Sequence, residues 1–258
     1  MRTYDAIEKV SNAIIKDGLC EAILIKGSIG RGDDDEYSDV DMYVVVRNDQ
    51  YENFLNKRIG YLTKYRPVLY SEHVNFVADQ IVAIYDDGLH FDLYTVTEET
   101  MPYTDKAKII YDPNKKFADY HAESRIITNE ELAECFSESL YDFIEGDTAY
   151  CRKNYPWAAY IMFHAIAKST ILLRYLYDKE HAYLGLKKIN EIIPKEQFSW
   201  IMSASSNLNK DDFSAAIDSI ITILEYVVNN IDEDIRRLFN IKFFEWIKEN
   251  LKTKLFVN

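Results

Sequence analysis

The stretch KGSIGRGDDDEYSDVDMYVVV, Lys26–Val46, places a Gly-Ser pair and two further glycines after one apolar run, and six acidic residues before another. Carboxylates crowded in this way repel one another, so the pattern indicates that a positively charged group is bound there. Asp39 and Asp41 stand two residues apart at the start of a predicted strand over 40–46. Because side chains alternate along a strand, both carboxylates are expected on one face, where they can share a cation.

The glycines around Ser28 form the second part of the pattern. Gly27, Gly30 and Gly32 allow the backbone to turn sharply and to approach a ligand closely. Ser28 adds a hydroxyl and a backbone N–H that can bind an anion. A phosphate held by this turn and a divalent cation held by the two aspartates would therefore be neighbours.

A third acid interrupts a later apolar strand. Asp92 lies in LHFDLYTV between Phe91 and Leu93. An unpaired carboxylate inside a sheet is costly, and the cost is tolerable if Asp92 faces the same metal ions. Three carboxylates can hold two Mg²⁺ ions across a triphosphate, which would activate an attacking hydroxyl and stabilise the leaving pyrophosphate. His90 is expected on the same face of the strand, either bordering this site or as an ordinary strand histidine.

The acidic stretch also has interpretations other than a metal site. Asp33 to Glu36 is interpreted as a solvated loop. A calcium-binding loop counted from Asp33 fails, because Ser38 stands where glycine is needed and Val44 where glutamate is needed. A P-loop fails for want of Gly-Lys-Ser/Thr.

The rest of the chain divides into two parts. The first ~115 residues predict mixed α/β structure with a small sheet: a helix over 4–17, strands over 20–28 and 40–46, a hairpin over 80–96 and a strand over 107–113. From Thr128, which has capping-box spacing to Glu131, only helices are predicted. The fold class is therefore α+β, with a small mixed β-sheet head and flanking helices at 1–120, followed by an all-α helical bundle at 121–258.

The composition limits the partners. The net charge of −13 argues against binding nucleic acid through general phosphate neutralisation and suits a small cationic substrate. Three widely spaced cysteines predict reduced thiols in a cytoplasmic protein. The longest apolar run, Trp157 to Ala167, is far shorter than the ~20 residues that cross a bilayer, so no membrane segment is expected.

These residues resemble the signature of the nucleotidyltransferase superfamily typified by DNA polymerase beta. That signature is Gly-Ser, a spacer, Asp-x-Asp, and a third acid on a following strand. Gly27, Ser28, Asp39, Asp41 and Asp92 match it position by position. The stretch GSIGRGDDDEYSDVDMY is especially similar to bacterial lincosamide and aminoglycoside nucleotidyltransferases.

The resemblance implies a Mg²⁺-dependent transfer of a nucleoside monophosphate, usually AMP from ATP, to a hydroxyl of a small molecule such as an aminoglycoside or lincosamide antibiotic, with release of pyrophosphate. Asp39 and Asp41 would ligate Mg²⁺. Asp92 would join them or act as general base on the acceptor hydroxyl. The Gly27–Ser28 segment would hold a phosphate, with Arg31 as a further candidate.

The helical region is similar to that of streptomycin 6-adenylyltransferases. Glu138 matches the first glutamate of their pattern, and Arg152 and Lys153 match a basic pair that would steady the triphosphate. Ser137 stands where the family has asparagine, and Asn154 where it has glutamate, so the resemblance leaves the identity of the drug open.

Glu138 also belongs to an acidic stripe with Glu130, Glu134 and Asp142, spaced four residues apart. The stripe is interpreted either as a solvent-exposed face or as a cation-binding wall with Glu138 as catalytic base.

Two alternatives to small-molecule transfer stay open: adenylylation of a protein partner, as in toxin–antitoxin pairs, and a non-catalytic nucleotide-binding module. The resemblance also implies a homodimer. The acceptor, the preferred base and the identity of the general base are not fixed by the sequence.

Overall fold

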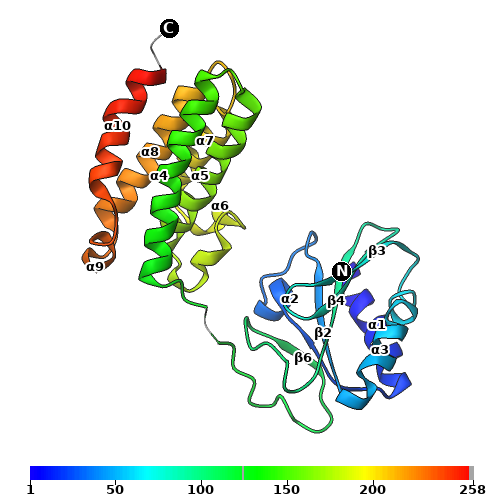
Figure 1. Ribbon diagram of the computed structural model, residues 1–258. Coiled ribbons are helices and arrows are strands. Elements are labelled where there is room, and N and C mark those ends of the chain that lie inside the picture. Colours follow the sequence, from blue (N-terminus) through cyan, green and yellow to red (C-terminus); the bar gives the residue numbers. More distant parts are fainter. Residues whose placement is uncertain (124, 256–258) are drawn as a thin grey trace. The chain divides into compact units, whose positions relative to one another are not determined.

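The computed structural model describes residues 1–123 and 125–255, and the chain divides into two compact units, Met1–Ser124 and Arg125–Asn258 (Figure 1). The apolar core clusters of each unit are built from that unit's own residues. The two units therefore have separate apolar cores.

The first unit contains a six-stranded sheet with strand order β3-β4-β5-β2-β1-β6. Its elements are α1 (Arg2–Asp17), β1 (Cys20–Ile25), α2 (Gly27–Arg31), β2 (Val40–Val46), the 3₁₀ turn η1 (Asn48–Gln50), α3 (Tyr51–Leu62), β3 (Val68–Asn75), β4 (Asp79–Tyr85), β5 (His90–Val96) and β6 (Lys108–Tyr111). Neighbouring strands run antiparallel, except that β2 and β5 are parallel. The small mixed sheet with flanking helices predicted for this region is confirmed.

Successive side chains of β2 lie on opposite faces of the sheet, in two different apolar clusters. Val40, Met42 and Val44 belong to an apolar core shared with α1 and α3, which lie on one face of the sheet (Figure 1). Tyr43 and Val45 belong to a second, smaller apolar cluster, which includes residues from the segment that follows β5. Asp41 has the same parity as Tyr43, so its side chain lies on the face of the second cluster.

Local sequence signals explain most boundaries in this unit. Gly18 ends α1 with φ of 74°, a left-handed conformation that favours glycine. Gly88, with φ of 75°, turns the chain between the antiparallel strands β4 and β5. Helix α3 and strand β3 were not among the expected elements.

Helices are the only regular secondary structure among the described residues of the second unit, as predicted. Its elements are α4 (Asn129–Cys151), α5 (Tyr155–Tyr175), the 3₁₀ segment η2 (Lys179–Leu184), α6 (Ile189–Ile192), α7 (Lys195–Ser206), α8 (Phe213–Asn230), α9 (Glu233–Arg236) and α10 (Ile241–Leu255). The capping box is present: Thr128 Oγ1 accepts from the Glu131 N–H, and the Glu131 carboxylate accepts from the Thr128 N–H. In the described part of the chain no helix combines the length and apolar character needed to cross a membrane.

Helices α4 and α5 approach closely at Gly146, where an added Cβ would lie 2.6 Å from Met162 Sδ. Helix α5 packs against α4, α7 and α8 within the bundle. Its aromatic residues Trp157, Tyr160 and Phe163 are exposed, because they lie away from the core residues Ala158, Met162 and Ala165.

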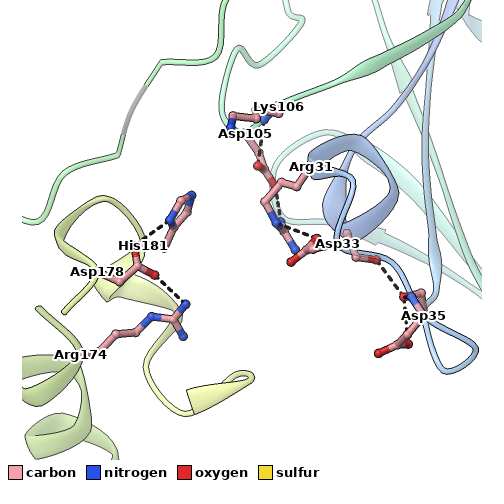
Figure 2. A network of polar contacts seen from close by, with 10 residues as sticks. Arg31, Asp33, Asp35, Asp105, Lys106, Arg174, Asp178 and His181 are labelled. Carbon is pink, nitrogen blue, oxygen red and sulfur yellow. Dashed lines mark hydrogen bonds and ion pairs between the residues drawn. The ribbon is translucent and has the colours of Figure 1, made fainter. Parts of the chain in front are cut away.

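A buried arginine fixes the segment after α5. The Arg174 guanidinium donates to the backbone carbonyl of Lys187 (2.6 Å). It also donates to Asp178 (3.0 Å), and Asp178 contacts His181 (2.9 Å), as Figure 2 shows. Burial of a charged group is compensated here by a carboxylate and by carbonyl oxygens.

Candidate functional site

The parallel pairing of β2 with β5 sets the position of two carboxylates. Asp41 is the register partner of Asp92, and the flanking residues Met42 and Leu93 are paired and buried on the opposite face. Register partners in a sheet point to the same side, so the two aspartates are neighbours. Asp39 precedes β2 by one residue and shares the parity of Asp41.

Gly27 is pressed against Asp41. An added Cβ at Gly27 would lie 2.0 Å from Asp41 Oδ2, and the φ of Gly27 is 62°. The Lys26 N–H donates to the Asp41 carbonyl (2.9 Å), which fixes the end of β1 beside the start of β2. The site therefore needs glycine at position 27 for both its backbone conformation and its lack of a side chain.

Ser28 is buried, and its hydroxyl donates to Ser38 Oγ (3.1 Å). Ser38 Oγ also accepts from the Asp35 N–H (2.9 Å), so the acidic loop is tied back to the Gly-Ser segment. The expected strand over 20–28 was too long: β1 ends at Ile25, and Gly27 and Ser28 begin the short helix α2. The spacer between the glycines and the aspartates is thus an ordered connection.

His90 joins the carboxylates. Its Nε2 lies 2.9 Å from Asp92 Oδ1. The hydrogen bond with Asp92 raises the pKa of His90, burial opposes this, and the charges of Asp92, Asp39 and Asp41 raise it further. The imidazole therefore interacts electrostatically with all three carboxylates, so His90 lies at the border of the site.

Lys26 is a residue beside the site that the sequence did not single out. Its side chain is buried and donates to the backbone carbonyls of Pro102 and Thr104. Burial lowers the pKa of Lys26 to about 8, against the opposing influence of Asp105 and Asp41. No local signal could have identified it, because its acceptors lie more than 70 residues away in the chain.

Two stacked tyrosines lie next to the aspartates on the same face. Tyr43 and Tyr94 are register partners two residues after Asp41 and Asp92, and their ring centroids are 4.2 Å apart. The Lys26 ammonium lies 4.4 Å from the Tyr43 ring centroid, a cation–π contact. Burial and the nearby carboxylates raise the pKa of both tyrosines, so both stay neutral at physiological pH.

Arg31 is engaged by acids of its own unit. Its guanidinium contacts Asp105 (2.7 Å) and Asp33 (3.3 Å), as Figure 2 shows. Asp33 is thus part of an ion pair, although it was expected to be a solvated loop residue. A phosphate that binds Arg31 would have to share the guanidinium with these two carboxylates or displace them.

The donor types at this site suit a hard cation, because Mg²⁺ prefers carboxylate oxygens. Asp41 and Asp92 provide two adjacent carboxylates, and Asp39 lies on the same face. Across the residues that the structure describes, however, no three His, Cys, Asp or Glu side chains form a group ready to hold a metal ion. One oxygen of Asp92 is engaged by His90. Metal binding by Asp39, Asp41 and Asp92 therefore stays a prediction.

Glu138, Arg152 and Lys153 all belong to the second unit, and their part in the site also stays a prediction. Glu138 forms an ion pair with Lys168. It lines a pocket of about 340 Å³ together with Arg125, Ile127, Glu131, Glu134, Cys135, Lys168, Ile171 and Tyr183. Arg152 and Lys153 are exposed in the turn between α4 and α5, where Lys153 has φ of 62°.

No protein-family model and no curated protein matches the chain. Among solved structures, the chain is similar to an aminoglycoside 6-adenyltransferase from Bacillus subtilis, with 11% identity, a TM-score of 0.42, and coverage of 98% of this chain and 97% of that one. It is also similar to a nucleotidyltransferase-like protein from Exiguobacterium sibiricum 255-15, with 14% identity, a TM-score of 0.36, and coverage of 87% and 75%. At these TM-scores the similarity carries no argument about activity, which has to rest on the geometry of the site.

Proposed function

We propose that the protein is a nucleotidyltransferase that moves a nucleoside monophosphate, AMP from ATP in the simplest case, to a hydroxyl of a small molecule and releases pyrophosphate. The observation that carries the proposal is the register pairing of Asp41 with Asp92 directly beside Gly27. A metal-bound triphosphate requires carboxylates for the metal and, next to them, a backbone that can approach the phosphates closely, which glycine allows.

The three aspartates have the leading role in the proposal. Asp39, Asp41 and Asp92 would hold Mg²⁺, which when bound supplies positive charge to the phosphates. The backbone N–H groups at Gly27 and Ser28 would bind a phosphate oxygen next to the carboxylates, since glycine at position 27 lets the backbone lie against Asp41. His90 holds one oxygen of Asp92 and so limits how that carboxylate can turn.

The acceptor hydroxyl needs a base. Asp92 and Glu138 are the two candidates, and they differ in their surroundings. Asp92 is buried beside His90, whereas Glu138 is ion-paired with Lys168 in a pocket of the second unit. In the proposal Arg152 and Lys153 would contact the triphosphate, and Arg31 would do so after leaving an acidic partner.

The net charge of −13 favours a cationic acceptor. An aminoglycoside has the required hydroxyls and ammonium groups, and a lincosamide has hydroxyls and an amine. Either antibiotic class is therefore a reasonable first substrate to test.

The test has a binding arm and an activity arm. ATP with Mg²⁺ is expected to raise the melting temperature, because a ligand that binds only the folded state stabilises it. Asp39→Asn combined with Asp41→Asn should abolish the Mg²⁺-dependent part of the shift. Glu36→Gln, which removes an exposed acid from the same loop, is the matched control and should leave the shift intact.

For activity, labelled ATP is incubated with a panel of aminoglycosides and lincosamides. We expect a nucleotidylated drug, and a loss of roughly 10²-fold or more in rate with the double Asn variant. Glu138→Gln separates the two base candidates, since loss of transfer with retained ATP binding would identify Glu138. Label on a protein instead of a drug would favour protein adenylylation. An unchanged Mg²⁺-dependent shift in the double variant would contradict the proposed site.

A further inference from the structure

The two helices that cover one face of the sheet, α1 and α3, form a pocket of about 480 Å³ (Figure 1). This volume is in the range of pockets that bind small molecules. Asp41 lies on the opposite face of the sheet, so the pocket is separate from the candidate site. The pocket is lined by Ala13, Lys16, Asp17, Asn56, Lys57, Gly60, Tyr61 and Lys64.

The pocket is positively charged, although the net charge of the protein is −13. Its lysines are Lys16, Lys57 and Lys64, and the carboxylate in its lining is Asp17. Asp17 accepts hydrogen bonds from Tyr61 (2.7 Å) and from Lys57 (2.9 Å), and both lower its pKa. Among the residues that the structure describes, neither Lys16 nor Lys64 has an ion-pair partner. The pocket therefore contains two ammonium groups that no carboxylate neutralises.

Helical spacing brings the α3 side of the pocket together. Lys57, Gly60 and Lys64 follow one another at steps of three and four residues, along α3 and the turn after it, so they lie on one face. On α1, Ala13, Lys16 and Asp17 have the same kind of spacing. The positive charge is therefore concentrated between two packed helices and does not depend on a loop.

Gly60 keeps the middle of this pocket open. It lies inside α3, where glycine is less favourable than alanine. Neither the backbone nor crowding requires glycine there, because its φ is not left-handed and an added Cβ would have nothing within 4 Å. A side chain at position 60 would extend into this open space. The consequence of the missing side chain is therefore an unobstructed pocket.

We propose that this pocket binds a small phosphorylated ligand through Lys16, Lys57 and Lys64. A phosphate monoester carries a charge of about −1.5 to −2 at pH 7. Three ammonium groups and one carboxylate leave the pocket with a charge of +2, which matches it. Lysine binds phosphate as a point charge on a flexible stem. Ala13 and the ring of Tyr61 add apolar surface for the body of the ligand.

Phenyl phosphate is a suitable probe, because it combines a dianion with an apolar ring and cannot donate a nucleotide. Titration calorimetry is carried out with EDTA, which removes Mg²⁺, and at constant low ionic strength, because salt screens exposed charges. We expect a Kd of ~1 mM or tighter. Benzoate, which has the ring but a single negative charge, should bind at least tenfold more weakly.

Variants assign the binding to the pocket. Lys16→Gln combined with Lys64→Gln should weaken phenyl phosphate binding at least tenfold. Both side chains are exposed, so the fold should be unaffected. The matched control, Lys115→Gln combined with Lys195→Gln, removes two exposed ammonium groups elsewhere and should change the Kd less than twofold. Gly60→Leu fills the pocket without changing its charge and should also weaken binding at least tenfold.

Four results would overturn the proposal: equal losses in the two double lysine variants, unchanged binding in Gly60→Leu, benzoate binding as tight as that of phenyl phosphate, and no binding of phenyl phosphate at ~10 mM. The melting-temperature shift with Mg²⁺ and ATP should be the same in the Lys16/Lys64 variant as in the wild type. Loss of that shift would also contradict the proposal, because the pocket would then belong to the nucleotide site. Since this pocket is independent of the transfer reaction, its failure would leave the proposed function untouched.

Discussion

Gly27 is under two separate constraints, and a single substitution can measure them. Gly27→Ala would place an alanine in a left-handed backbone conformation and a Cβ 2.0 Å from Asp41 Oδ2, and both destabilise the folded state. We expect a loss of roughly 2–4 kcal/mol in the free energy of unfolding, from about 1 kcal/mol of backbone strain plus overpacking. Gly18→Ala is the matched control. Gly18 has φ of 74° with nothing within 4 Å, so it should lose only the strain.

Chemical denaturation of both variants gives the comparison. Adding Asp41→Ala to Gly27→Ala should recover part of the loss, because the two positions share one contact. Equal losses at positions 18 and 27 would contradict the contact between Gly27 and Asp41.

Individual residues show which parts of the site the sequence reveals. Strand alternation alone places Asp39 with Asp41 on one face of a strand, and His90 with Asp92 on one face of another. That the two pairs meet depends on the parallel register of β2 and β5. Lys26 does not follow, because its environment is made by carbonyls from a distant segment. The Arg31–Asp105 ion pair is likewise invisible in sequence, and it changes what Arg31 has to give up in order to bind a phosphate.

At the scale of elements, the contact between α4 and α5 buries an acid. Asp142 belongs to the stripe interpreted as a solvent face or a cation-binding wall, yet its side chain is buried. Burial raises the pKa of Asp142 from 3.8 to about 6, His164 and Lys168 lower it, and Glu138 and Glu145 raise it. The stripe curves into the interface because residues four apart drift around a helix of 3.6 residues per turn.

This buried acid makes stability depend on pH. The pKa of Asp142 is higher in the folded state, so the protonated carboxyl contributes to the free energy of unfolding. This contribution is fully present below about pH 3.8 and is lost as the pH rises through about 6. Asp142→Asn should therefore stabilise the second unit by roughly 1–3 kcal/mol at about pH 8 and have little effect at about pH 4. Urea unfolding at the two pH values measures this.

The control for Asp142→Asn is Glu130→Gln, an exposed member of the same stripe. It should change stability by no more than a few tenths of a kcal/mol at either pH. If both variants were more stable than the wild type at high pH, general charge repulsion, and not burial of Asp142, would be responsible for the effect.

The elements that the sequence predicted are those with strong local signals. Strand β2 was predicted with its observed bounds, and the capping box at Thr128 correctly placed the start of α4. Helix α3 and strand β3 were missed. The exposed strand lacks an alternating apolar pattern, since its side chains are exposed on both faces.

At the scale of the whole molecule, the two units have separate cores, which predicts separate unfolding. Leu62→Ala in the first unit and Leu140→Ala in the second remove the same fully buried side chain. Each should cost ~2–5 kcal/mol. Calorimetry should show two transitions, with each variant lowering a different one. A single transition lowered by both variants would contradict independent cores.

The division into a sheet-containing head and a helical region was readable from sequence because the periodicity of the apolar residues changes from two to about 3.6 near Thr128. The sequence could not show whether the second unit contributes residues to the site, because it gives no information on distances between residues of different units. This applies to Glu138, Arg152 and Lys153. For Glu138 the Glu138→Gln variant described above decides the question.

The parallel neighbours β2 and β5 have one more consequence. To bring two strands side by side in the same direction, the chain must cross over between them, and here residues 47–89 make that crossover through α3 and through β3 and β4, which belong to the same sheet. Asp41 and Asp92 lie at the two ends of this crossover and are held together by the pairing of β2 with β5. Insertions in the surface loops of the crossover can therefore accumulate without separating the two carboxylates.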